Sequence, residues 1–84
     1  SRINFSIYPN PTDENLSINI TDNIENISIT IYNIHGQLIW RKDELNSRNM
    51  TIPVSNFDLK TGYYIIQLQS DSKVSNKRFV YIRK

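Results

Sequence analysis

The sequence predicts an all-β domain built as a two-layer antiparallel sandwich of about seven strands. Apolar and polar residues alternate with a period of two in several short segments, and no longer window keeps a helical repeat. The chain holds fourteen isoleucines and eleven asparagines but no alanine, a mix that favours strands and turns over helices. Turn-forming residues separate the apolar segments at intervals typical of a sandwich.

The alternation is clearest in four segments, each of which puts its apolar side chains on one face and polar ones on the other, as in antiparallel sheets with one solvated face. The apolar sets are Ile3, Phe5 and Ile7; Leu16, Ile18 and Ile20; Ile27, Ile29 and Ile31; and Tyr64, Ile66 and Leu68. Further strands are expected at residues 38–41, 50–53 and 77–83. Residues 79–82 are apolar on both faces, so the last strand is expected inside a sheet with neighbours on both sides.

Both glycines of the chain fall at predicted chain reversals. Residues 33–36 fit a type I turn that Gly36 closes in the left-handed region, so we expect a tight hairpin and a positive φ at Gly36. Gly62 begins the sixth strand after a polar crossover segment. Phe57 and Leu59 in that segment are expected to plug one end of the sandwich, since such apolar plugs are more often core than binding site.

Residues 8–18, YPNPTDENLSI, connect the first two strands through two prolines. Pro9 and Pro11 lack an N–H and push the residue before each towards extended geometry, so the segment cannot be a central strand. The Thr-Asp-Glu-Asn run supplies side chains that bond nearby backbone amides and turn the chain. The residues alone therefore predict a rigid corner that aims the first strand.

Composition argues against several classes of function. The chain of 84 residues is one domain of marginal stability, and it has no cysteine for a disulfide or a thiolate zinc site. The net charge of +2 is scattered and points to no nucleic-acid or membrane partner. His35 is the only histidine and lies at a hairpin tip without an evident orienting partner. We expect no catalytic, metal or cofactor site.

Trp40 and five tyrosines leave one alternative open. Aromatic rings side by side on an exposed face could stack on sugar rings, although packing in the core and on the sheet faces is favoured. A carbohydrate-binding or adhesive sandwich module of an exported protein is therefore the alternative function. Exposed aromatic residues in one row would support it, and buried tyrosines would count against it.

Four segments follow one another in a fixed order and cover nearly the whole chain: YPNPTDENLSI at residues 8–18, ISITIYNIHGQLIW at 27–40, TIPVSNFDLKTGYYIIQL at 51–68 and KRFVYIRK at 77–84. Together they resemble the type A C-terminal sorting domain carried by substrates of type IX secretion (the Por secretion system), the exported proteins of Bacteroidetes. Each segment is weak alone, and the match is specific because all four occur at family spacings.

The resemblance implies an immunoglobulin-like sandwich, with residues 1–84 as a single sorting domain cut from a larger secreted protein. Such a domain is not an enzyme. It directs its cargo from the periplasm across the outer membrane, to the cell surface or the exterior. The implied partners are the outer-membrane translocon, a shuttle protein, the upstream cargo domain and a sortase-like peptidase that removes the domain at or before the first strand, near Ser1. No cofactor, nucleic acid or stable membrane insertion is implied.

The resemblance also implies which residues the secretion machinery recognises. They are Pro9, Asn10, Pro11, Gly36, Gly62, Lys77, Arg83 and Lys84. The basic C-terminal residues suit recognition in a cleft or by β-augmentation. Two positions depart from the family: Gln37 stands where Arg or Lys is frequent, and residues 70–76 lack a frequent glycine, so a longer, looser last hairpin is expected. Self-association through an edge strand, the seventh or its neighbour, stays open.

Overall fold

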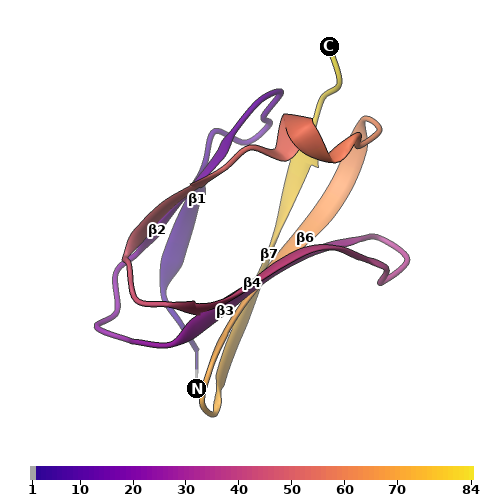
Figure 1. The fold of residues 1–84 in the computed structure, drawn as a ribbon. Helices are drawn as coiled ribbons and strands as arrows, with labels where there is room; N and C mark the ends of the chain where they lie inside the picture. The colour runs from indigo at the N-terminus through magenta and orange to yellow at the C-terminus, as the bar shows by residue number, and fades with distance from the viewer. Residues whose placement is uncertain (1) are drawn as a thin grey trace.

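The computed structural model describes residues 2–84, which form seven strands and one short 3-10 helix in two facing antiparallel sheets (Figure 1). The elements are β1 (Phe5–Tyr8), β2 (Leu16–Ile20), β3 (Ile27–Asn33), β4 (Leu38–Leu45), β5 (Asn49–Ile52), η1 (Val54–Phe57), β6 (Gly62–Ser70) and β7 (Lys73–Tyr81). One sheet has the order β1-β2-β5 and the other β4-β3-β6-β7. The predicted all-β, immunoglobulin-like antiparallel sandwich is confirmed.

The apolar faces predicted from the alternation point into the space between the sheets. Every residue of the four predicted apolar sets is buried except Ile7, which is half-buried. The largest fully buried side chains are Phe79, Leu16, Ile18, Ile27, Ile29, Ile31, Ile52, Ile66, Leu68 and Val54. Within residues 2–84, no buried side-chain nitrogen or oxygen lacks a hydrogen-bond partner. The core is thus mostly aliphatic, and its buried polar side-chain atoms are hydrogen-bonded.

β4 is longer than the strand predicted at residues 38–41, because it runs on to Leu45. Its added residues are mostly charged and exposed, so they show no apolar alternation in the sequence. β4 is an edge strand that pairs only with β3, and its register with β3 shifts twice. An edge strand can carry charged residues on both faces, so the alternation of apolar and polar residues does not reveal it.

β7 differs most from the expectation. It starts at Lys73 rather than residue 77, and it lies at the edge of its sheet with β6 as its only strand neighbour. The prediction of strand neighbours on both sides was therefore wrong. Phe79 and Tyr81 face the core, whereas Val80 is half-buried and Ile82 is 45% exposed. An isolated parallel bridge from Thr12 to Tyr81 covers only the end of the strand.

Each of the two hairpin turns of the four-stranded sheet has a residue in the left-handed backbone region, which is a glycine in one turn and an aspartate in the other. In the β3–β4 turn the N–H of Gly36 donates to the carbonyl of Asn33 at 3.1 Å, and Gly36 has a φ of 80°, as predicted. The β6–β7 turn is a tight two-residue turn in which Asp71 has a φ of 49°. The expected longer, looser hairpin was wrong because aspartate tolerates the left-handed conformation without glycine.

The crossover from β5 to β6 closes one end of the sandwich, as predicted. Leu59 is buried in the core, and Phe57 at the end of η1 packs partly against it. The ring of Phe57 stacks on Trp40, with 5.9 Å between centroids. This contact covers one side of Trp40 and ties β4 to the crossover segment.

Candidate recognition site

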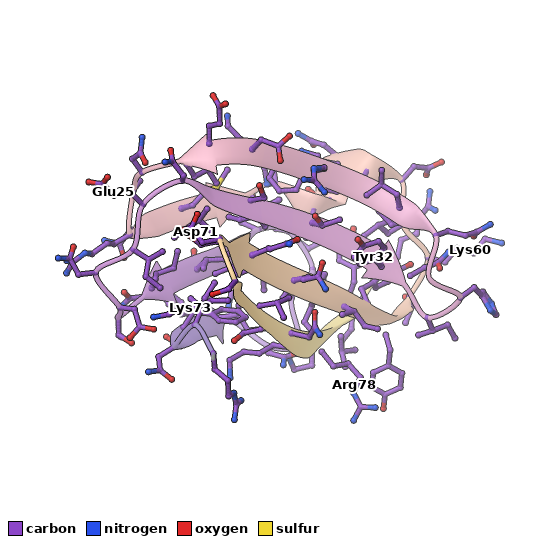
Figure 2. All side chains as sticks on the ribbon, turned by 90° about the horizontal axis from the view of Figure 1, so that it is seen from below. Glu25, Tyr32, Lys60, Asp71, Lys73 and Arg78 are labelled. Carbon is purple, nitrogen blue, oxygen red and sulfur yellow. The ribbon has the colours of Figure 1, made fainter. Side chains whose placement is uncertain are left out.

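Several connections meet at one end of the molecule, the end at which the C-terminus lies (Figure 1). The strand pairing agrees with this placement. Tyr8 at the end of β1 pairs with Ser17 near the start of β2, and Gly62 at the start of β6 pairs with Tyr81 at the end of β7. We call residues 9–13, 58–62 and 82–84 the C-terminal pole. The described chain begins at the opposite end, beside the β6–β7 turn (Figure 1). Figure 2, a view from below, shows Asp71 and Lys73 at that turn.

The corner between β1 and β2 bonds to the open edge of β7. The side-chain Oδ1 of Asn10 accepts from the N–H of Val80 at 2.9 Å, and its Nδ2 donates to the carbonyl of Arg78 at 3.4 Å. The N–H of Thr12 donates to the carbonyl of Val80 at 2.9 Å, and its carbonyl accepts from the N–H of Ile82 at 2.8 Å. Asn10 and Thr12, the edge cap, therefore take the place of a neighbouring strand along this part of β7.

The prolines on either side of Asn10 fit this arrangement. Pro9 and Pro11 have no N–H, so neither adds an unpaired donor beside the strand edge. Both are exposed, as is Asn10, so the outer surface of the corner is accessible. The predicted rigid corner is present, and it also joins the first sheet to the second. The sequence alone showed the stiffness but not the partner strand.

The C-terminal residues are bonded to the same pole. The N–H of Arg83 donates to the hydroxyl of Thr61 at 2.8 Å, and its guanidinium lies 3.1 Å from the carboxylate of Asp58. The ammonium of Lys84 lies 3.7 Å from the carboxylate of Asp13. All four charged side chains are exposed, and such pairs contribute about 0–1 kcal/mol to stability. These pairs orient the basic side chains more than they stabilise the fold.

Not every residue singled out from the sequence lies in this cluster. The corner and the pair Arg83 and Lys84 come together through the contacts above, and Gly62 begins β6 beside Thr61. Gly36 lies in the β3–β4 turn, and no hydrogen bond within residues 2–84 links it to the corner or to the C-terminal residues. Lys77 lies halfway along β7, with its ammonium 5.4 Å from the ring centroid of Phe5. Sequence reasoning missed the partner residues Thr12, Asp13, Asp58 and Thr61, because they looked like ordinary loop residues.

The two glycines should respond differently to substitution. Gly36→Ala should cost about 1–2 kcal/mol of unfolding free energy, because its φ of 80° is unfavourable for an L-residue. Gly62→Ala should change it by less than about 0.5 kcal/mol, because a Cβ there meets nothing within 4 Å and the backbone is extended. Urea denaturation of both variants measures the difference. Equal losses would contradict a special backbone conformation at Gly36.

A family model for the secretion system C-terminal sorting domain matches residues 6–83, which include the corner and the first of the two basic terminal residues. The chain belongs to this family. The resemblance seen in the sequence is confirmed, and the sorting domain is the C-terminal sorting signal of type IX secretion. A sorting domain of this kind implies export across the outer membrane to the cell surface or the exterior, contact with the secretion machinery and attachment to a cargo. The family is defined by sorting and not by catalysis.

The sorting domain is similar to part of one longer protein. It is 32% identical over 75 residues to the ulvan lyase NLR42 of Nonlabens ulvanivorans, a match that covers 88% of this chain and 14% of the lyase. The chain thus spans a small part of that relative's length. Among solved structures, the sulfur carrier protein SoxY from Chlorobium limicola f thiosulfatophilum shares 11% identity with a TM-score of 0.53, covering 100% of this chain and 80% of SoxY. That likeness concerns the fold alone.

Two carboxyl groups of the sorting domain have pKa values lowered by hydrogen bonds. The backbone N–H of Asn4 donates to Asp22 at 2.8 Å and lowers the pKa of that carboxyl below its usual value. A hydrogen bond from Ser28 lowers the pKa of Asp43 in the same way. Both carboxyls lie outside the C-terminal pole and stay ionised at neutral pH. In the part of the chain that the structure describes, no three metal-ligating side chains cluster, and no helix has the length and apolar character of a membrane span.

The aromatic residues of the sorting domain do not support the sugar-binding alternative. Tyr64 and Tyr81 are buried, and Trp40 is half-buried against Phe57. Tyr8 and Tyr63 are about half exposed, but they lie on β1 and β6, in different sheets. The guanidinium of Arg78 lies 4.9 Å from the ring centroid of Tyr63. Buried tyrosines count against a stacking platform, as stated above.

Proposed function

We propose that residues 1–84 form one C-terminal sorting domain of a larger secreted protein, and that the machinery recognises the C-terminal pole of this domain. One observation carries the proposal: Thr12 and Ile82, near opposite ends of the family match, are bonded to each other, and the two basic residues that follow Ile82 pair with Asp58 and Asp13. A surface assembled from both ends of the chain exists only after folding. The signal is therefore a folded shape.

The recognised side chains divide into two kinds. Pro9, Asn10 and Pro11 present a stiff exposed corner, and Arg83 and Lys84 present two exposed cations beside it. Cations on a fixed scaffold can form charge-assisted hydrogen bonds with carboxylates of a partner protein. Gly36 and Gly62 act indirectly, by setting the β3–β4 turn and the start of β6.

The proposed route follows from the family. The cargo reaches the periplasm, a shuttle protein and the outer-membrane translocon take up the folded domain, and a sortase-like peptidase removes it. The bond near Ser1 at which cleavage is expected lies outside the described residues. A cargo joined beside the β6–β7 turn would leave the C-terminal pole uncovered, because the two lie at opposite ends (Figure 1). The machinery could then bind the domain and the cargo could stay folded.

The test is a periplasmic reporter fused to residues 1–84 and expressed in a host with type IX secretion. We expect the fusion outside the cell, the unfused reporter in the periplasm, and the fusion in the periplasm when the translocon is deleted. A fusion without Arg83 and Lys84 should be exported poorly. Retention of the complete fusion in the periplasm would disprove the sorting function for this chain.

A further inference from the structure

The edge cap covers only part of the open edge of β7. In an antiparallel pair, successive residues direct their N–H and C=O groups alternately towards and away from the neighbouring strand. Val80 and Ile82 use their outward groups to bond Asn10 and Thr12, and Arg78 uses its carbonyl. The same alternation directs both backbone groups of Asn76, and the N–H of Arg78, away from β6. No hydrogen bond within residues 2–84 reaches these groups.

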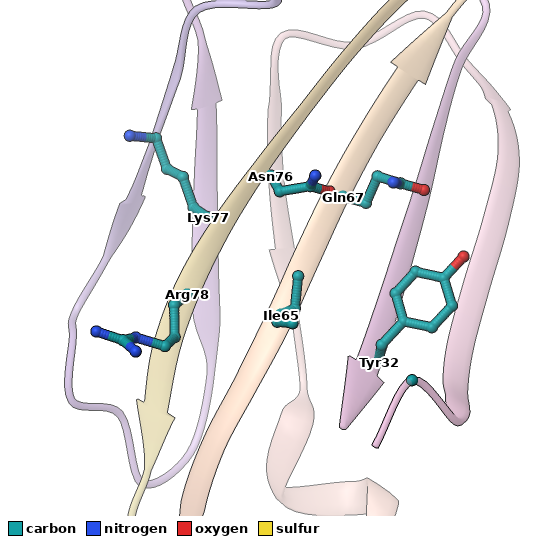
Figure 3. A pocket seen from close by; sticks show the side chains of 7 residues that line it. Tyr32, Ile65, Gln67, Asn76, Lys77 and Arg78 are labelled. Carbon is teal, nitrogen blue, oxygen red and sulfur yellow. The ribbon is translucent and has the colours of Figure 1, made fainter. Parts of the chain in front are cut away.

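Two cationic side chains, those of Lys77 and Arg78, lie on this uncovered stretch. Figure 3 shows the side chains of Lys77 and Arg78 extending from β7 on the side away from β6. Neither takes part in an ion pair among the described residues, and each lies over an aromatic ring instead, Phe5 for Lys77 and Tyr63 for Arg78. Their charge is therefore available to a partner at the sheet edge.

The space beside the edge can receive a chain. Ser6, Ile7 and Asn10 line its far side, and Lys77 and Arg78 line the near side, around a cleft of about 420 Å³ between β1 and β7. The lining contains no carboxylate. Extended peptides bind such places by adding a strand to the exposed edge, with backbone bonds giving affinity and side-chain pockets giving specificity.

The charges beside the uncovered edge of β7 indicate which kind of strand can bind there. Lysines on edge strands protect sheets against pairing with other edges, and two copies paired through β7 would bring Lys77 and Arg78 close to the same residues of the other copy. A strand with acidic side chains would instead neutralise both. The other edge of this sheet, β4, carries cations and anions together, and Arg41 already pairs with Asp43 at 2.9 Å. Unpaired positive charge beside free backbone groups is therefore a feature of β7.

We propose that the uncovered edge of β7, from Asn76 to the N–H of Arg78, binds an extended acidic segment of a secretion-machinery protein, which adds a strand to the four-stranded sheet. This inference rests on the proposed function and names a second contact, separate from the C-terminal pole. The edge cap sets the C-terminal limit of this contact, because Asn10 and Thr12 already bond the edge from the carbonyl of Arg78 onwards.

The experiment uses the reporter fusion in the secreting host. Asn76→Pro removes the outward N–H without changing charge, and an edge strand tolerates proline where the N–H faces out. The double variant Lys77→Glu and Arg78→Glu reverses the charge and keeps the backbone. Arg41→Glu with Lys42→Glu on β4 is the matched control, with the same charge change on the opposite edge. Thermal unfolding of each isolated domain identifies variants that do not fold.

We expect both β7 variants to lower the extracellular fraction about tenfold, as the loss of a charged or backbone contact does, and the β4 control to match the unsubstituted fusion. Normal export of both β7 variants, with the unsubstituted fusion exported, would overturn this inference and leave the sorting function standing. Loss with the charge variant alone, when Asn76→Pro folds, would exclude strand addition. Retention of the unsubstituted fusion would refute the sorting function itself.

Amide hydrogen exchange of the isolated domain provides a check that needs no variant. The N–H of Asn76 should exchange quickly because it faces solvent, and the N–H of Val80 should exchange slowly because Asn10 accepts from it. Equal protection of the two amides would show that the edge is already covered, and would overturn the inference.

Discussion

Replacing Phe79 by alanine should lower the free energy of unfolding by about 3–5 kcal/mol. The side chain of Phe79 is fully buried between the sheets, and its ring packs against Tyr64 with 5.8 Å between centroids. Small domains are stable by only about 5–15 kcal/mol, so this single change should remove much of the stability. Urea denaturation followed by the fluorescence of Trp40, the only tryptophan, measures the loss.

Val74→Ala is the matched control, because Val74 lies on the same strand and is 44% exposed. It should change the stability by less than about 0.5 kcal/mol. Similar losses for both variants would contradict the assignment of Phe79 to the core. The same two variants test whether the sorting signal must be folded. A reporter fused to the Phe79→Ala domain should stay in the periplasm at temperatures where that domain is unfolded.

Replacing Asn10 by alanine should cost about 1–3 kcal/mol, because it leaves the N–H of Val80 and the carbonyl of Arg78 without their partners. The backbone bonds of Thr12 remain, so the fold should survive. Two measurements check this: urea denaturation, and amide exchange at Val80, which should become faster.

Asn76→Ala serves as the control for Asn10→Ala. Asn76 is an exposed asparagine on β7 whose side chain makes no hydrogen bond within residues 2–84, so its loss should be nearly neutral. If Asn10→Ala proved as neutral as Asn76→Ala, with unchanged exchange at Val80, the edge cap would not stabilise the strand.

Features with local causes could be predicted from the sequence. Alternation identified the inward faces of β1, β2, β3 and β6, because a half-buried strand must separate apolar from polar residues. The positive φ of Gly36 followed from turn chemistry within four residues. The plug at Leu59 was predictable because apolar residues in a polar crossover need burial.

Features with distant causes could not be predicted. Asn10 and Val80 are 70 residues apart, and nothing in the corner sequence identifies β7 as its neighbour. The order of strands places β7 at an edge, whereas the apolar run at residues 79–82 suggested a central strand. Asp13 and Asp58 looked like solvated loop charges until the fold brought Lys84 and Arg83 beside them.

Family resemblance and physical reasoning contributed different parts of the proposed recognition site. The resemblance indicated Pro9, Asn10 and Pro11 without giving a reason for the asparagine. The structure supplies one, since only a side chain with both a donor and an acceptor can bond two backbone groups of a strand edge. For Lys77 the resemblance gave a position, and the structure places that position at an uncovered edge.

Export of fusions that differ only in two cations tests the recognition of the C-terminal pole most directly. Arg83→Ala with Lys84→Ala removes both cations of the pole. Arg48→Ala with Lys73→Ala removes two cations at the opposite end, where the carbonyl of Arg48 accepts from the N–H of Ile20 at the end of β2 and Lys73 begins β7. Exposed ion pairs add little stability, and Arg48 loses only an exposed hydrogen bond to Asn23, so both domains should fold normally. We predict that the first pair lowers the extracellular fraction about tenfold and that the second leaves it near the unsubstituted value. Equal export of the two variants would contradict recognition at this pole.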